Sequence, residues 1–325
     1  MSWQKRTEEI LQGRELAREE ALAVLQSGNQ EWPELLQAVF QVRKQFYGMD
    51  VNLHVINNAK SGACSENCAF CSQSAVSESP IAHYKIKTVE ELIAGAREAV
   101  RLGAVKYCTV ISGRAPSEKE LDIFCEAFQL IKQETKIHLC VSPGLLTRDQ
   151  ARQLKQAGAD RINHNLETSR RFFPSICTTH TYDARIETIQ NAKAEGLEIC
   201  CGGLVGLGET LEDRVELAFT LKELGVHSIP VNFFNPREGT PLAKIQPIAA
   251  LDALRALAMF RLVNPSCDIR AAGGREANLR GLQVQALYIA NSIFTQGYLT
   301  TPGQGHSVDL TLIADAGFRV AAIES

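Results

Sequence analysis

Residues 136–166 read KIHLCVSPGLLTRDQARQLKQAGADRINHNL, and this stretch contains the unit from which the fold is built. Its first positions alternate between apolar and polar side chains, as in a strand with one buried face. Thr147-Arg-Asp-Gln150 is a capping box that starts a helix, and Gly158 stands where that helix should end. A second strand pattern begins at about residue 160. The order strand, helix, strand is the connection that joins parallel strands in α/β proteins.

The same unit recurs along most of the chain. Capping boxes at 88–91 and 117–120, and glycines at Gly103, Gly196 and Gly225, mark further helix starts and ends. The candidate strands are 51–57, 105–112, 136–142, 160–166, 197–205, 227–234, 267–273 and 288–294. Eight such units predict an α/β fold of the TIM type, a (βα)8 barrel, and a more open α/β sheet is the alternative.

The first part of the chain follows a different pattern. Apolar residues such as Leu35 and Val39 recur at helical spacing, and Pro33 suits the first turn of a helix. We therefore expect an N-terminal helical cap at residues 1–48, followed by the barrel with a C-terminal tail at residues 49–325. The sequence contains no low-complexity linker that would divide the chain further.

The composition is that of an ordinary globular protein, because 45% of the 325 residues are hydrophobic and 22% are charged. No apolar run approaches the roughly 18 residues of a membrane span, and the first residues lack the apolar core of a secretory signal. A net charge of −3 gives no general attraction to nucleic acid or to anionic membranes. We therefore expect a cytoplasmic protein that binds neither nucleic acid nor membranes.

The sequence has 10 cysteines, which in a reducing compartment indicate metal or cluster ligation rather than disulfides. Three of them form the motif Cys64-Ser-Glu-Asn-Cys68-Ala-Phe-Cys71, directly after the first candidate strand. Three thiolates in one short loop can hold three irons of a [4Fe-4S] cubane and leave the fourth iron open to an exogenous ligand. The alternatives are a zinc site, which would need a fourth ligand, and incidental cysteines.

Side-chain parity assigns the strand residues to two faces of the barrel wall. In the third candidate strand His138, Cys140 and Ser142 share one face, and in the fourth Asn163 and Asn165 do the same. A barrel with a purely structural interior would fill these positions with branched apolar residues. The polar set therefore predicts a ligand cavity inside the barrel.

Three further cysteines, Cys108, Cys140 and Cys200, come from different strands and point inward by the same parity argument. Arg270 joins them from the seventh candidate strand. By its chemistry a buried arginine is an anion or carboxylate clamp, because the guanidinium normally stays charged and has no free lone pair for a metal. The other cysteines are expected to be packing or incidental residues: Cys125, Cys177, Cys201 and Cys267.

The first cysteine motif, with the aromatic Phe70 before its last cysteine, resembles the signature of the radical S-adenosylmethionine superfamily. Within that superfamily the chain is similar to the biotin synthase family over nearly its whole length after the helical cap. The matching segments include Asn163-His-Asn-Leu-Glu167, Gly239-Thr-Pro-Leu242, Gly273-Gly-Arg-Glu276 and Asn291-Ser-Ile-Phe294.

The resemblance implies S-adenosylmethionine and two clusters as cofactors. It assigns the [4Fe-4S] cluster to the first motif, with Phe70 beside the adenine, Arg185 on the carboxylate of S-adenosylmethionine, and Asn165 and Glu167 on the ribose. Glu167 departs from the family pattern, which has the shorter aspartate in many members. In place of a carboxylate clamp, the resemblance implies a [2Fe-2S] cluster held by Cys108, Cys140, Cys200 and Arg270.

The resemblance also implies the substrate and the reaction. Asn165 and Asn232 would bind the ureido ring of dethiobiotin, while Lys60, Thr300 and Thr301 would receive its far end and carboxylate. A 5′-deoxyadenosyl radical would activate dethiobiotin, and the [2Fe-2S] cluster would donate the sulfur that forms biotin. A flavodoxin or ferredoxin as reductant and a homodimer are further expectations.

Two other interpretations remain at this stage. One is another barrel enzyme of the superfamily, of the methylornithine synthase or hydrogenase-maturation type, and the other is a non-enzymatic cluster carrier. The polar barrel interior disfavours a carrier, and the set of three inward cysteines with Arg270 disfavours the other enzymes.

Overall fold

Strand β1 (Asp50–Lys60) closes the sheet of the computed structural model, which describes residues 2–323. It pairs in parallel with β2 (Lys106–Ile111) on one side and with β9 (Ser292–Phe294) on the other. Between them the sheet continues in parallel through β3 (His138–Ser142), β4 (Arg161–Asn163), β5 (Glu198–Cys200), β7 (Ser228–Phe233) and β8 (Asp268–Ala271). These eight strands form a closed barrel, so the predicted TIM-type fold is confirmed and the open-sheet alternative is wrong.

The fifth predicted strand, at residues 197–205, is interrupted in the structure. β5 ends at Cys200, and the chain resumes as β6 (Gly203–Val205) beside β7. At Gly202 a Cβ atom would lie 2.1 Å from the carbonyl oxygen of Pro230, and at Gly203 it would lie 2.3 Å from that of Glu167. Only glycine permits such close backbone approaches, and they separate the two short strands.

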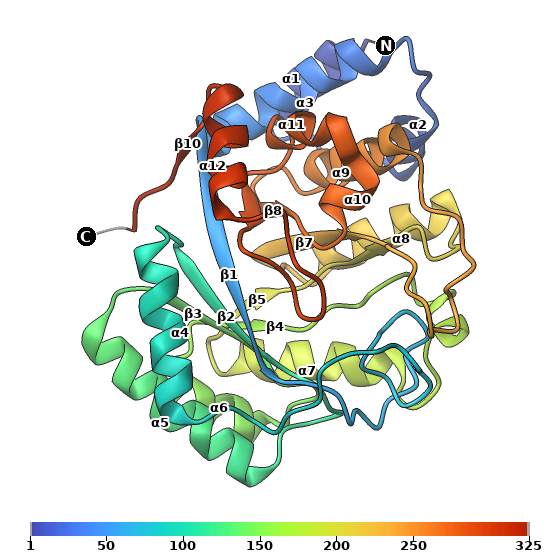
Figure 1. Ribbon diagram of the computed structural model, residues 1–325. Helices are drawn as coiled ribbons and strands as arrows, with labels where there is room; N and C mark the ends of the chain where they lie inside the picture. The colour runs from blue at the N-terminus through green and yellow to red at the C-terminus, as the bar shows by residue number, and fades with distance from the viewer. Residues whose placement is uncertain (1, 324–325) are drawn as a thin grey trace.

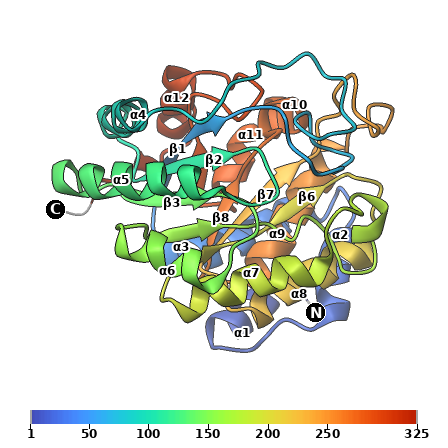
Figure 2. The ribbon, with the colours of Figure 1, turned by 90° about the horizontal axis from the view of Figure 1, so that it is seen from below.

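Each barrel strand is followed by helical structure on the outside of the barrel (Figures 1 and 2). The helices are α4 (Val89–Arg101), α5 (Glu118–Glu134), α6 (Arg148–Gln156), α7 (Tyr182–Ala194), α8 (Leu211–Glu223), α9 (Ala250–Val263), α10 (Arg275–Leu279), α11 (Gln283–Leu287) and α12 (His306–Asp315). Short 3₁₀ turns occur at η1 (Phe173–Ser175) and η2 (Arg280–Leu282). A last strand, β10 (Arg319–Val320), pairs with the start of β1.

The predicted helix boundaries are confirmed by their capping contacts. The side chains of Thr88, Ser117 and Thr147 each accept a hydrogen bond from the backbone N–H three residues later. The glycines predicted to end helices have φ between 59° and 101°, the left-handed region that side chains disfavour. They are Gly103, Gly158, Gly196 and Gly225.

Three helices precede the barrel: α1 (Trp3–Leu11), α2 (Arg18–Gln26) and α3 (Trp32–Tyr47). Pro33 lies in the first turn of α3, as expected. α2 packs against α8 and α9, and α3 packs against α9, so the helices cover the end of the barrel at which β1 begins (Figure 1). Leu35 and Val39 are fully buried there, and burial of each such side chain contributes about 1.5–3 kcal/mol.

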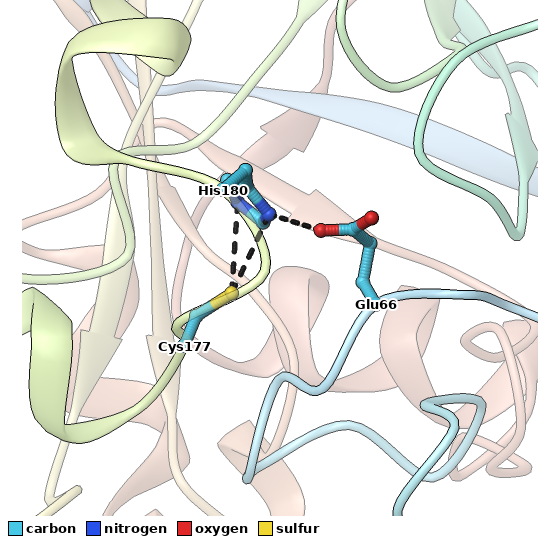
Figure 3. Close-up of side chains that lie close together, drawn as sticks. All are labelled: Glu66, Cys177 and His180. Atoms are coloured by element: carbon cyan, nitrogen blue, oxygen red, sulfur yellow. Dashed lines mark hydrogen bonds and ion pairs between the residues drawn. The ribbon is translucent and has the colours of Figure 1, made fainter.

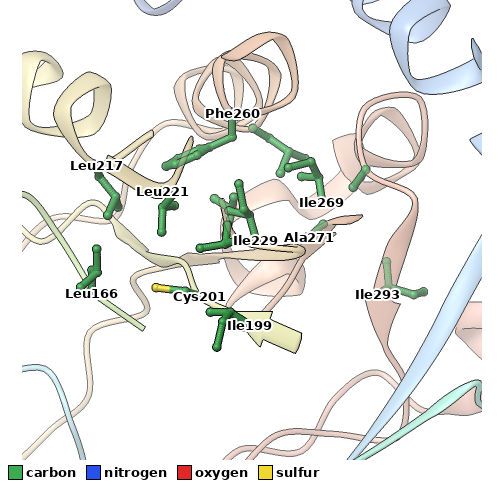
Figure 4. Close-up of a cluster of buried hydrophobic side chains, with 14 of the residues drawn as sticks. Leu166, Ile199, Cys201, Leu217, Leu221, Ile229, Phe260, Ile269, Ala271 and Ile293 are labelled. Atoms are coloured by element: carbon green, nitrogen blue, oxygen red, sulfur yellow. The ribbon is translucent and has the colours of Figure 1, made fainter. Parts of the chain in front are cut away.

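An apolar layer separates the barrel wall from its helices, as strand parity predicts. Figure 4 shows the strand residues Ile199, Ile229 and Ile269, together with Cys201 just beyond the end of β5, among helix residues such as Phe260. This layer stabilises the barrel from outside and leaves the opposite strand faces to the interior. Among residues 2–323, no helix is both long and apolar enough to cross a membrane.

Candidate functional site

A cavity of about 380 Å³ lies at the carboxyl ends of the barrel strands, which confirms the prediction of a ligand cavity in the barrel. Its size is within the range of small-molecule sites. Its wall includes most of the predicted site residues, namely Cys64, Cys68, Phe70, Cys71, Cys108, Cys140, Asn165, Glu167, Arg185, Asn232, Arg270, Thr300 and Thr301.

The loop that carries the first cysteine motif is held at several points. It turns at Gly62, where a Cβ atom would lie 2.2 Å from the imidazole of His83. The amide of Gly62 donates to the side chain of Gln73 at 3.0 Å, and the amide of Ala69 donates to the carbonyl of Ile176 at 2.8 Å. These contacts hold the motif against one wall of the cavity, so its thiols are already grouped.

The three thiols of this motif fit an iron–sulfur cluster. Cys64, Cys68 and Cys71 are free thiols that face the same cavity. Burial raises the pKa of the Cys71 thiol to about 11, and the neighbouring Cys64 adds to the effect. A thiol that loses its proton so reluctantly becomes a ligand only beside a strong positive charge, which iron supplies.

The second set of cysteines lies deeper in the barrel. Cys108 and Cys140 are paired across β2 and β3, and both are buried. Cys200 is buried below the cavity wall, where its Sγ accepts a hydrogen bond from Nη2 of Arg270 at 3.0 Å. A hydrogen bond from Cys140, together with the charge of Arg270, lowers the pKa of Cys108 to about 7. The parity prediction that these three cysteines point inward agrees with these contacts.

Arg270 completes this set with an unusual environment. Its Nη1 donates to Nδ1 of His54 at 2.6 Å, and its guanidinium lies 4.6 Å from the ring centre of Phe294. Its Nε is buried and has no hydrogen-bond partner in the part of the chain that the structure describes. A buried donor without a partner costs about 1–3 kcal/mol, which fits a position completed by a bound group. Three buried thiols around this guanidinium suit a [2Fe-2S] cluster better than a carboxylate.

Arg185, on α7, reaches the end of β4. Its Nη1 donates to the carbonyl oxygen of Asn165 at 2.6 Å and lies 3.6 Å from the Glu167 carboxylate. Glu167 has a φ of 69°, a strained conformation for a residue with a side chain. Burial raises the pKa of the Glu167 carboxyl, and Arg185 opposes that rise. The three residues predicted to bind S-adenosylmethionine beside Phe70 therefore lie together.

Asn232, on β7, is held by the backbone at both ends of its amide. Its Oδ1 accepts from the amide of Gly273 at 2.9 Å, and its Nδ2 donates to the carbonyl of Gly203 at 3.1 Å. A primary amide has two donors and two lone pairs, so one donor and one lone pair remain. Asn232 therefore presents an oriented donor and acceptor at the cavity wall.

Lys60 is placed differently from the other predicted substrate residues. Thr300 and Thr301 line the cavity, where Thr301 Oγ1 accepts from Arg237 at 2.6 Å. Lys60 is absent from the cavity wall, and its Nζ pairs with Glu120 at 2.7 Å. The pairing of β1 with β2 shifts register just before Lys60, and such a bulge changes the direction of nearby side chains.

Three residues that sequence reasoning did not select also lie close together: Glu66 and His180, which line the cavity, and Cys177 beside them (Figure 3). We expected Cys177 to be a packing or incidental residue, but its Sγ lies 3.7 Å from that of Cys68. Nδ1 of His180 lies 3.4 Å from the Cys177 Sγ and bonds to the Glu66 carboxylate. The signal available in the sequence is that Cys177 and His180, two residue types that can bind metals, are only three positions apart.

Glu66 is buried, and burial by itself would raise the pKa of its carboxyl. Hydrogen bonds from Thr179 and His180 outweigh burial, and they lower the pKa of Glu66 below its ordinary value. Glu66 is therefore an anionic acceptor inside the first cysteine motif.

The comparisons with known proteins agree with this geometry. The radical SAM superfamily model matches residues 59–221, and the model of the biotin and thiamin synthesis associated domain matches residues 230–319. The crystal structure of a methylornithine synthase has a TM-score of 0.87 over 98% of each chain, and at 20% identity this likeness concerns the fold alone. The fold and the loop cysteines thus define a protein of the radical S-adenosylmethionine superfamily.

Closer relatives narrow the assignment. The chain is 48% identical, over 99% of its length, to a biotin synthase of Salinibacter ruber, of which 90% is covered. It is 47% identical, over 98% of its length, to a biotin synthase of Geobacillus thermodenitrificans, of which 96% is covered. The chain belongs to the biotin synthase family, and the resemblance inferred from the sequence motifs is confirmed.

Proposed function

We propose that this protein inserts sulfur into dethiobiotin to form biotin, with S-adenosylmethionine, a [4Fe-4S] cluster and a [2Fe-2S] cluster as its cofactors. The observation that carries the proposal is the presence of two separate thiol sets at one cavity, the loop set around Cys68 and the barrel set around Cys140. Radical generation needs only the first set. A second set inside the same barrel is useful when the substrate must react beside it.

The chemistry of the bound groups is the cleavage of S-adenosylmethionine by an electron from the first cluster and the supply of sulfide sulfur by the second. Cys64, Cys68 and Cys71 would hold the first cluster. Cys108, Cys140, Cys200 and Arg270 would hold the second. Because both sets are buried or line one cavity, the chain brings them close to the substrate and excludes bulk water from them.

S-adenosylmethionine would lie between Phe70 and Arg185. Arg185 suits the carboxylate because a guanidinium offers forked donors. Asn165 and Glu167 would bind the ribose hydroxyls. The 3.4 Å hydrogen bond from Nδ2 of Asn165 to the Glu167 carboxylate would then be replaced by hydrogen bonds to the ribose. Phe70 offers a flat apolar face to the adenine.

The substrate would be held by groups that match a cyclic urea. Such a ring presents N–H donors beside a carbonyl acceptor, and Asn232 retains one acceptor and one donor after its backbone contacts. Asn165 would share this task. Thr300, Thr301 and Lys60 would bind the far end and carboxylate, which for Lys60 requires release from Glu120.

Further parts of the proposal concern partners. A flavodoxin or ferredoxin would deliver electrons to the cluster loop, which follows β1 at the open end of the barrel. We further infer that the protein acts in the cytoplasm as a homodimer.

Isotope transfer in a single turnover tests the function and the sulfur source together. The [2Fe-2S] cluster would be reconstituted anaerobically with labelled sulfide, free sulfide removed, and dethiobiotin, S-adenosylmethionine and reductant added. We expect labelled biotin and loss of the cluster absorption. Unlabelled biotin with an intact labelled cluster would refute the sulfur source, while failure to form biotin with both clusters loaded would favour another superfamily enzyme or a cluster carrier.

A further inference from the structure

Glu66, His180 and Arg185 form a chain of hydrogen bonds along the cavity wall, and Figure 3 shows its first link. Nε of Arg185 donates to Nε2 of His180 at 2.9 Å. Nδ1 of His180, on the other side of the ring, bonds to the carboxylate of Glu66. The exposed fractions of these three residues are only 5–8%, so water competes little with the chain of bonds.

The bond from Arg185 determines where His180 carries its proton. A guanidinium only donates hydrogen bonds, so Nε2 of His180 must present a lone pair to it. The proton of the neutral imidazole is then on Nδ1, which donates it to Glu66. Glu66, Cys177 and His180 have the spacing of a cation site, but Nδ1 in this tautomer has no lone pair for a metal. The group is a hydrogen-bond relay.

The relay determines the direction of the Arg185 guanidinium. Its Nε is bound to His180 and its Nη1 to the carbonyl oxygen of Asn165. Its Nη2 has no hydrogen-bond partner among residues 2–323, and the side chain lines the cavity. Two bonds to residues of different loops therefore hold the planar group and leave one amino group for an anion in the cavity.

We propose that His180 is a positioning residue, which together with Glu66 orients Arg185 to bind the carboxylate of S-adenosylmethionine. The choice of ligand rests on the function proposed above. Glu66 lies between Cys64 and Cys68, so the relay joins the loop that would hold the [4Fe-4S] cluster to the carboxylate site. S-adenosylmethionine must contact the open iron and Arg185 at the same time. The relay would favour this because it fixes the position of Arg185 relative to the cluster loop.

The test compares His180→Leu with His180→Gln in reconstituted protein under anaerobic conditions, with equilibrium binding of S-adenosylmethionine as the measurement. Leucine removes both bonds, whereas the glutamine amide can accept from Arg185 and donate to Glu66. We expect His180→Leu to weaken binding about tenfold, as loss of a buried charged hydrogen bond does, and His180→Gln to recover most of it. His306→Leu, a substitution on α12 outside the cavity wall, is the matched control.

A double-substitution cycle separates positioning from a general structural role. In an Arg185→Gln background, His180→Leu should weaken binding by much less than tenfold, because no guanidinium remains to be oriented. An equal loss in both backgrounds would overturn the proposal, as would native affinity in His180→Leu. If His180→Leu does not fold, Glu66→Ala provides the same cycle, since it removes the acceptor that holds the imidazole.

Iron content and cluster absorption, measured on every sample, distinguish the two proposals. Native cluster content with weakened binding supports the relay. Wild-type protein that holds its clusters but binds no S-adenosylmethionine contradicts the proposed function, whereas native binding in the His180→Leu protein contradicts only the relay.

Discussion

Two adjacent cysteines, Cys200 and Cys201, have opposite environments. Cys200 contacts Arg270 inside the barrel, while Cys201 lies in the apolar layer between the wall and the helices (Figure 4). Burial raises the pKa of the Cys201 thiol well above its ordinary value, so it behaves as a small apolar side chain. Of these two neighbouring residues, Cys200 is therefore placed to bind a cluster, whereas Cys201 packs in the apolar layer.

Serine substitutions at these two positions should have different effects. We expect Cys200→Ser to remove most of the [2Fe-2S] absorption after reconstitution, because a ligand is lost. Cys201→Ser should keep that absorption while it lowers the free energy of unfolding by about 1–3 kcal/mol, since a polar hydroxyl replaces the thiol inside the apolar layer. Equal loss of the cluster in both proteins would contradict this division.

Cys68 and Cys177 provide a second contrast, because their sulfurs are 3.7 Å apart. We expect Cys68→Ala to abolish formation of 5′-deoxyadenosine from S-adenosylmethionine, since a cubane iron loses its ligand. Cys177→Ala should retain the [4Fe-4S] cluster, because three ligands from the motif suffice. Metal analysis and electron paramagnetic resonance of both proteins are the measurements. A Cys177→Ala protein without a cluster would instead indicate a fourth protein ligand, as a zinc site requires.

At the scale of elements, the gap between β5 and β6 depends on close backbone contacts. A Cβ atom at Gly202 would lie 2.1 Å from the Pro230 carbonyl oxygen, which cannot move without disturbing β7. Gly281, in η2, has open space around it and an ordinary φ. A side chain at position 202 would therefore clash with the backbone of β7, whereas a side chain at position 281 would not.

Alanine substitutions test this difference. We expect Gly202→Ala to lower the free energy of unfolding by about 1–3 kcal/mol, the usual cost of overpacking. Gly281→Ala should change it by less than about 0.5 kcal/mol. Urea denaturation of both proteins measures the effect, and equal stabilities would show that the gap tolerates a side chain.

At the scale of the whole molecule, the barrel is assembled around groups that lack complete partners. Arg270 is buried near three thiols, and its Nε has no hydrogen-bond partner among residues 2–323; the thiols of the loop motif line the same cavity. Closure depends on β1, which pairs with both β2 and β9, the first and last of the other barrel strands along the chain. Groups bound in the cavity would contact several strands at once.

Cluster loading should therefore stabilise the entire fold. A group that binds only the folded state raises the free energy of unfolding by mass action. We expect the melting temperature to rise on anaerobic reconstitution and the rise to shrink in Cys68→Ala and Cys200→Ser proteins. Differential scanning calorimetry of cluster-free and reconstituted protein is the measurement, and identical melting temperatures would contradict the expectation.

The sequence by itself determined the repeat of strand and helix and the separation of cysteines by parity. Helix caps and strand alternation act over a few residues, so capping boxes such as Thr147–Gln150 located elements correctly. The family could be inferred because its motifs are also local. Cys108, Cys140 and Cys200 could be assigned to the interior because successive residues of a strand face opposite sides.

Only the tertiary structure decided which distant groups meet. The Cys68–Cys177 contact joins residues 109 positions apart, and the link from Glu66 to His180 spans 114. The break after β5 and the pairing of Lys60 with Glu120 likewise depend on atoms of other strands and helices. Such contacts follow from how loops and helix ends pack around the closed barrel, and no local pattern of residues encodes that packing.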